Sequence, residues 1–144
     1  MKKIVTILFI LLSSFSFAQE FQTRKERDKN KPYFFIKDSL ISKLQPIFIE
    51  QLSKVERHDI VSLRVTTHTK FEGIITRFIK TDKLISLTVN SLEVQNLILI
   101  YTDITTETGE HVYKAILMSK EHKDVLILEN NYWYKKEMSD LIPD

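Results

Sequence analysis

Side chains suited to metal or acid–base chemistry are sparse in this chain of 144 residues. The histidines are His58, His68, His111 and His122, and none stands in an H-E-x-x-H or comparable ligand spacing. His58 is the best single candidate because Glu56 and Asp59 flank it, although a histidine at such a junction usually hydrogen-bonds locally. Cysteine is absent, which excludes zinc ribbons, iron–sulfur clusters and thiol nucleophiles. The sequence therefore predicts no metal site and no cofactor.

Signs of nucleophilic or nucleotide chemistry are equally weak. Gly73 and Gly109 are the only glycines, so the chain has neither a G-x-S-x-G elbow nor a glycine-rich phosphate loop. A pair of catalytic carboxylates stays open, because such pairs meet only in three dimensions. A catalytic acid needs an apolar pocket that raises its pKa, however, and most acidic residues here fall in turns or on polar stripes. We predict no catalytic residue and favour a protein without enzymatic activity.

Hydrogen-bond donors recur on one side of two predicted strands. Ser62, Arg64, Thr66 and His68 share one parity, Ser86, Thr88 and Asn90 share another, and Arg77 falls between the two segments. If these strands pair, the donors form a surface for a carboxylate or a sugar, because a guanidinium offers a bidentate fork. The alternative is a solvated sheet face that is rich in threonine for its β propensity.

The densest aromatic cluster lies near the C-terminus. On a strand, Tyr132 and Tyr134 share one side and Trp133 takes the other. One side should enter the core, and the other would then offer an aromatic platform for a glycan or a protein partner. The alternative is that these aromatics all pack inside, one of them beneath the leader or the tail.

The first 18 residues have the pattern of a secretory signal peptide. Lys2 and Lys3 precede an apolar run, and Ser16 and Ala18 occupy the −3 and −1 positions of a small-residue cleavage site. The apolar stretch of about 14 residues is shorter than the roughly 20 that a transmembrane helix needs. We therefore expect cleavage, export to the periplasm or the medium, and no stable membrane insertion afterwards.

Charge and composition limit the partners further. The chain has 21 Lys and Arg against 19 Asp and Glu, and loss of Lys2 and Lys3 leaves 19 of each sign. A neutral exported protein lacks the clustered basic footprint of nucleic-acid binders. Residues 19–32 are mostly charged and predict a flexible leader, and residues 33–144 then form a single domain.

The periodicity of apolar residues predicts the elements of that domain. Spacings of three and four over residues 38–56 indicate a helix that contains Pro46. Either one kinked helix spans the whole segment, which we favour, or a turn at 38–44 precedes a helix that begins at Pro46. Period-two alternation then predicts strands, with Val61, Leu63, Val65, Ile85, Leu87 and Val89 as inward rows. Residues 97–101 are apolar on both parities, which is typical of a strand covered on both faces.

These elements predict an α+β fold with one N-terminal amphipathic helix on a curved, mainly antiparallel sheet of about six strands. In element order alone it resembles the cystatin-like or helix-grip arrangement, and a small β-barrel with an N-terminal helix is the alternative. The functional expectation is an exported binding module whose polar sheet face and C-terminal aromatics hold a protein or a glycan. The alternative is a carrier or small enzyme with a cavity between helix and sheet. An edge strand also leaves a homo-oligomer open.

Overall fold

The computed structural model describes residues 31–33, 42–67 and 69–141. The predicted signal peptide, most of the predicted leader and His68 lie outside these residues. No helix in the described part of the chain is long and apolar enough to cross a membrane.

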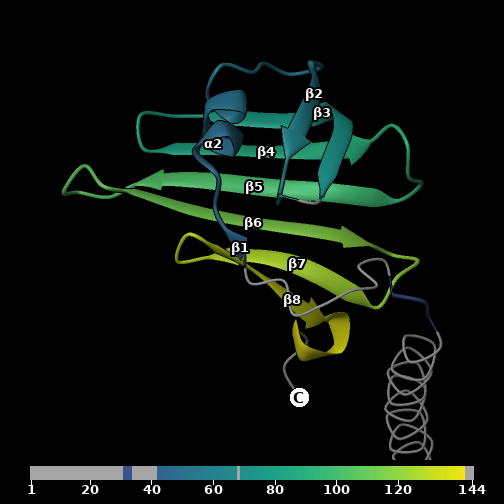
Figure 1. The fold of residues 1–144 in the computed structure, drawn as a ribbon. Coiled ribbons are helices and arrows are strands. Elements are labelled where there is room, and N and C mark those ends of the chain that lie inside the picture. The colour runs from purple at the N-terminus through teal and green to yellow at the C-terminus, as the bar shows by residue number, and fades with distance from the viewer. Residues whose placement is uncertain (1–30, 34–41, 68, 142–144) are drawn as a thin grey trace, which may run out of the picture.

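The described residues form one antiparallel sheet of eight strands, in the order β1-β8-β7-β6-β5-β4-β3-β2 (Figure 1). Strands β2 to β8 follow one another as a meander, and β1 joins the far edge beside β8. The bounds are β1 Ser42–Lys43, α2 Pro46–Ser53, β2 Ile60–Arg64, β3 Lys70–Lys80, β4 Leu84–Ser91, β5 Leu97–Thr105, β6 His111–Ser119, β7 Asp124–Glu129, β8 Tyr132–Glu137 and a 3-10 helix Met138–Leu141.

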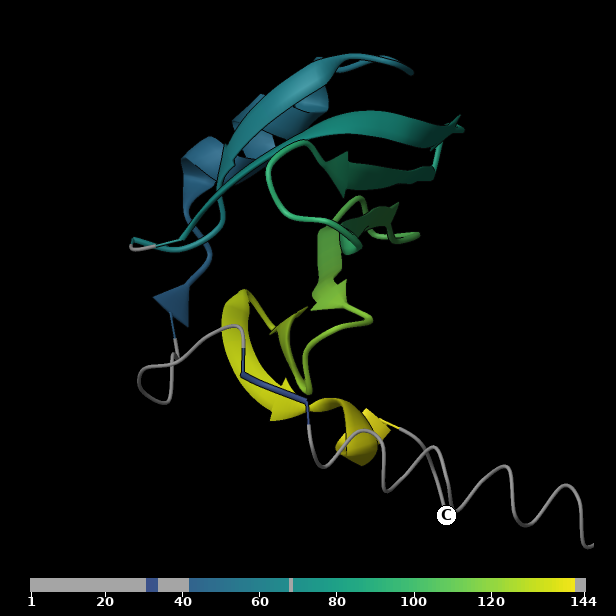
Figure 2. The same ribbon diagram turned by 90° about the vertical axis from the view of Figure 1, so that its right-hand side faces the viewer.

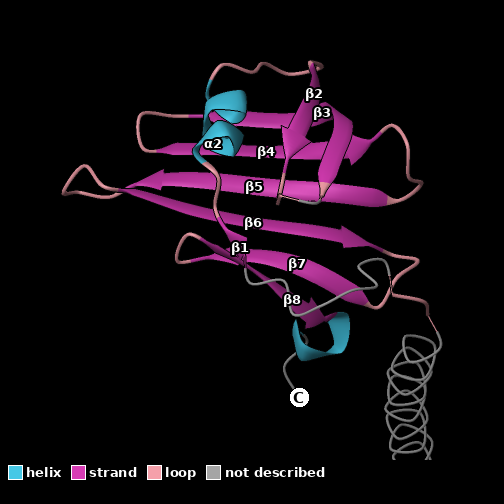
Figure 3. Cartoon of the chain, viewed as in Figure 1, coloured by secondary structure: helices cyan, strands magenta, loops and turns pink. Residues whose placement is uncertain are grey.

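The sheet curls into a half-barrel, and α2 lies across its open side (Figures 1 and 2). The fold is therefore mostly β rather than a balanced α+β arrangement of about six strands (Figure 3). The barrel-like alternative fits in part, because the sheet curves strongly but its edge strands β1 and β2 do not pair. Two elements account for the larger number of strands than the predicted six. They are the very short β1, and β8, which extends three residues beyond Tyr134.

The helix is shorter than the favoured prediction of one kinked element over residues 38–56. It begins at Pro46, with Gln45 still extended at φ −84° and ψ 131°, and Ser42 and Lys43 pair as a strand with β8. Proline fixes its own φ and has no N–H to donate, so it suits the first position of a helix and disrupts an interior turn. The alternative prediction, a helix that starts at Pro46, is confirmed.

The core lies on the inner face of the sheet, the face toward α2. The predicted inward rows are confirmed: Val61, Leu63, Val65, Leu87 and Val89 are buried and Ile85 is half-buried. From the helix, Phe48 and Leu52 enter this core with exposures of 0% and 2%. The ring of Phe48 meets Tyr101 and Trp133 edge-on, at centroid distances of 5.7 and 5.6 Å. These contacts fasten α2 to the middle and to the β8 side of the half-barrel.

Candidate functional site

The outer face of the sheet, which points away from α2, carries two rows of aliphatic side chains. Strand register aligns Ile100, Ile116 and Ile127 across β5, β6 and β7, and aligns Ile98 with Met118 in the next row. Alternation along each strand directs these residues away from the inner core, and none of them belongs to the core cluster. We call these five side chains the outer patch.

The side chains of the outer patch are half-buried, and Val125, which pairs with Met118 beside the patch, is fully buried. Within the described residues, no helix or strand packs across the outer faces of β5 and β6 (Figure 2). Among the described residues, the expectation that residues 97–101 are covered on both faces is therefore met on the inner side alone. A contiguous apolar surface on a soluble domain commonly marks an interaction site.

Polar residues predicted for binding border this patch. Arg77 pairs with Thr88, which in turn pairs with Ile100, and Asn90 lies opposite Ile98. At the other border, Tyr132 and Tyr134 lie on the outward positions of β8, and Tyr134 pairs with Ile127. The structure thus brings Arg77, Thr88, Asn90, Tyr132 and Tyr134 to one face, around a centre that sequence reasoning had not selected.

The remaining predicted binding residues lie elsewhere. Arg64 is outward-facing on the edge strand β2, opposite Lys70 and away from the outer patch. Strand β3 separates β2 from β4, so the two donor strands do not pair. Thr66 is fully buried in the following turn, where its Oγ1 accepts a hydrogen bond from the N–H of Thr69 at 3.0 Å. Trp133 is 0% exposed on the inner face, so it packs in the core and does not reach a partner.

Charge is distributed unevenly over the domain. Residues 33–144 hold 14 Lys and Arg against 16 Asp and Glu. By register and alternation, the outward positions of the sheet hold six of those basic residues and two of those acidic residues. They are Lys43, Arg64, Lys70, Arg77, Lys114 and Lys136, with Glu72 and Glu129. The outer face is therefore basic on a domain with a small negative net charge.

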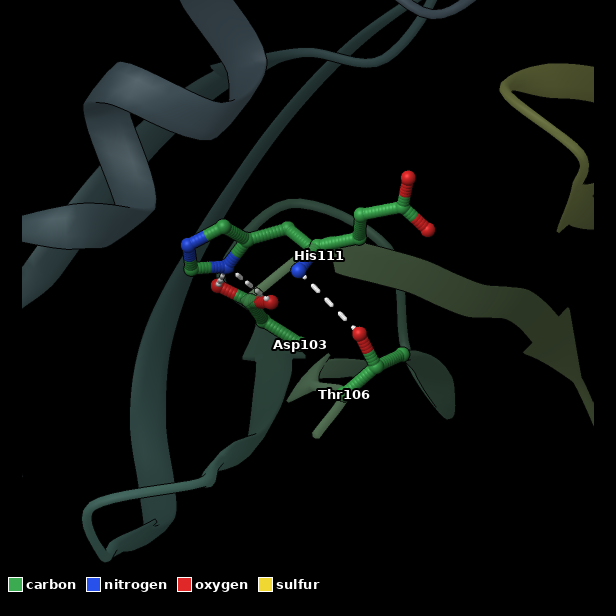
Figure 4. A network of polar contacts seen from close by, with 4 residues as sticks. Asp103, Thr106 and His111 are labelled. Atoms are coloured by element: carbon green, nitrogen blue, oxygen red, sulfur yellow. Dashed lines mark hydrogen bonds and ion pairs between the residues drawn. The ribbon is translucent and has the colours of Figure 1, made fainter. Parts of the chain in front are cut away.

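A second polar cluster lies where β5 and β6 meet their hairpin loop (Figure 4). The Nδ1–H of His111 donates to the carboxylate of Asp103, at 2.8 Å to Oδ1 and 3.1 Å to Oδ2. In the loop, Thr106 Oγ1 accepts from the N–H of Glu110 at 3.1 Å. The ring of Tyr113 stacks on His111 at a centroid distance of 5.9 Å. This cluster holds the imidazole in one orientation.

A histidine oriented by a carboxylate is half of a general-base arrangement. Acyl transfer also needs a nucleophile and a donor group for the developing oxyanion, and the contacts of His111 provide neither. No group of three or more His, Cys, Asp or Glu side chains in the described part of the chain is placed to bind a metal ion. The backbone N–H of His58, the best sequence candidate for a ligand, donates to the Ile75 carbonyl at 2.9 Å, a contact that does not involve its imidazole. The Asp103 contact supports a structural role for His111.

Two tyrosines beside Asp103 give this cluster a measurable signature. Burial and then the Asp103 charge raise the pKa of Tyr113, and burial, Asp103 and Tyr113 raise the pKa of Tyr101, from an ordinary value of 10.0. A raised pKa in the folded state stabilises the protein fully below pH 10.0, and this stabilisation is lost as pH rises above it. We expect absorbance titration to show two late-ionising tyrosines, and urea unfolding to show stability falling above that pH. Asp103→Asn should advance both ionisations, and late ionisation that persists unchanged in this variant would exclude the carboxylate as a cause.

A hollow of about 360 Å³ lies beside α2 and the outer edge of β2, with Gln51, Lys54, Asp59 and Ser62 among its lining residues. Gln51 crosses this edge: its Nε2–H donates to the Ser62 carbonyl at 2.8 Å and its Oε1 accepts from the Arg64 N–H at 3.3 Å. A side chain that satisfies edge groups in this way protects a strand from unwanted pairing. The hollow is a surface feature, separate from the inner face that Phe48 and Leu52 occupy.

Comparison with known proteins supplies no relative for this arrangement: no family model, no curated protein and no solved structure matches the chain.

Proposed function

We propose that this protein is an exported, non-catalytic binding module and that its partner docks on the outer patch and its borders. The carrying observation is an aliphatic centre that no described helix or strand covers, formed by Ile98, Ile100, Ile116, Met118 and Ile127. Domains normally bury such rows against a second layer. A partner that covers them gains the hydrophobic free energy that the isolated domain leaves unused.

The character of the patch favours a partner with apolar groups over a free glycan. Sugar rings stack on flat, exposed aromatic faces, and Trp133 is in the core rather than on the surface. Tyr132, which is 40% exposed, remains at the border, but the centre is aliphatic. Arg77, Thr88 and Asn90 then provide polar contacts at the rim, as is usual at interfaces.

The alternative of a carrier or enzyme with a cavity under the helix has no support from the inner face. Phe48 is 0% exposed and its ring touches Tyr101 and Trp133, so the space beneath α2 is occupied by side chains. The position that would hold a lipophilic ligand belongs to the protein's own core.

Site-specific photo-crosslinking in the producing cell tests this proposal. A photoreactive residue at Ile116, inside the outer patch, should give a discrete adduct. The matched control is Ile47, which is 44% exposed on α2, away from the patch, and should give none. Equal labelling at both positions, or no adduct with either protein or lipid at Ile116, would count against docking on the outer patch.

A further inference from the structure

The curvature of the sheet determines which strands a flat surface reaches first. In the order of eight strands, β5 and β6 are the two in the middle, and they lie at the crest of the convex side (Figure 2). Four residues of the outer patch, Ile98, Ile100, Ile116 and Met118, belong to this crest. Farther along the same strands, Ile104 and Val112 pair with each other and are exposed. A plane that approaches the convex side therefore meets two groups of aliphatic side chains, with the Thr102–Lys114 pair between them.

Cationic side chains lie on this crest and around it. Arg77 is on β3, Lys114 is on β6 beside Thr102, and Lys136 is on β8. Lys136 has one acidic neighbour, Glu129, at 4.0 Å, and both side chains are about half exposed, so this pair neutralises little. The excess of basic over acidic groups on the outer face opposes close approach of a second copy through the same face. It favours an anionic partner.

An anionic bilayer combines these chemical requirements in one surface. Apolar groups on a crest can reach the acyl boundary, while the longer cationic side chains around them remain at the level of the phosphates. Tyrosine is enriched at this same interfacial level, and Tyr132 and Tyr134 lie on the outward side of β8. A protein partner would instead need an apolar groove with acidic rims that matches this convex surface.

From this shape and charge we infer that the outer patch binds the surface of an anionic phospholipid bilayer peripherally, with β5 and β6 nearest the membrane. This inference rests on the proposed function, because it names the partner of the same face.

Sedimentation with vesicles tests the inference on the protein purified as its cell exports it. Vesicles of equimolar phosphatidylglycerol and phosphatidylcholine should bind the protein, and binding should weaken as salt is added. Pure phosphatidylcholine vesicles should bind it much less. The double variant Lys114→Gln/Lys136→Gln should bind the anionic vesicles about 25-fold more weakly, since each cation near such a surface contributes roughly a five-fold factor.

The matched control is Lys83→Gln/Lys120→Gln, which removes the same charge from exposed turns outside the outer face and should change binding less than about two-fold. Both double variants have the same N-terminal segment, so a difference in vesicle binding between them is due to the outer face. Urea unfolding of each variant shows whether it is folded. No binding to the anionic vesicles, equal binding to both lipids, or equal losses for the two pairs would overturn the inference. If a protein adduct forms at Ile116 while vesicles fail to bind, the lipid inference fails and the proposed function stands; if both are absent, both fail.

Discussion

Replacing Phe48 with alanine should lower the free energy of unfolding by about 3–5 kcal/mol, the cost typical of deleting a buried aromatic ring. Helix α2 has eight residues and no side-chain hydrogen bond at its N-cap, and a helix this short is not stable by itself in water. Its attachment depends on Phe48 and Leu52, which are buried in the core. The alanine variant leaves a cavity against Tyr101 and Trp133 and weakens the only described helix that crosses the inner face. Urea denaturation measures the loss.

Ile47→Ala is the matched control, because Ile47 is the neighbouring residue on α2 and is 44% exposed. We expect it to change the free energy of unfolding by less than about 0.5 kcal/mol. Similar losses in the two variants would show that Phe48 does not anchor the helix.

The second large effect is expected at Gly73, where β3 and β4 approach closely. A Cβ atom at this position would lie 2.5 Å from the carbonyl oxygen of Asn90 and 2.7 Å from Cγ1 of Val89. A backbone oxygen cannot swing aside as a side chain can, so β4 itself must move. We expect Gly73→Ala to cost about 3 kcal/mol, at the upper end of the usual cost of overpacking a core, in the same urea experiment.

Gly109→Ala separates this steric effect from the general loss of a glycine. Gly109 is in the hairpin loop with φ +84°, and an added Cβ there meets nothing within 4 Å. Its expected cost is the backbone strain of a left-handed residue, about 1–2 kcal/mol. A smaller loss at Gly73 than at Gly109 would contradict the close approach of β3 and β4.

The long strands could be predicted because each has a local signal. Val61 and Leu63, or Leu87 and Val89, alternate with polar residues, and period two is a property of the strand itself. The full length of β8 was not evident, because Lys135 and Lys136 follow its aromatics. Its turn, Asn130-Asn131, has φ of 51° and 63°, as a tight hairpin requires. β1 has no local signal: Ser42 and Lys43 form a strand only because β8 lies beside them.

The candidate site was predictable residue by residue but not as an arrangement. Alternation placed Thr88 and Asn90 on one face, yet their neighbours depend on register, and β3 has a bulge between Ile75 and Arg77 that changes it. The aliphatic centre carried a visible signal, since residues 97–101 are apolar on both parities. That pattern predicts a strand covered on both faces. In the described residues only one side is covered, and this difference carries the functional proposal.

The Asp103–His111 contact depends on strand pairing and is not evident from the sequence. In sequence, the acidic residues nearest to His111 are Glu107 and Glu110. In the hairpin, His111 pairs with Thr105 and Asp103 pairs with Tyr113, so the imidazole reaches the carboxylate diagonally across the two strands. Only the register of the hairpin identifies Asp103 as the partner of His111.

The hydrogen bonds of Gln51 to β2 have a consequence for assembly. An open sheet with an unprotected edge strand can pair edge to edge with copies of itself, which leads to aggregation. Here the Ser62 carbonyl and the Arg64 N–H already bond to the helix. An incoming chain must therefore detach α2, and with it the ring of Phe48, before aggregation can begin at this edge.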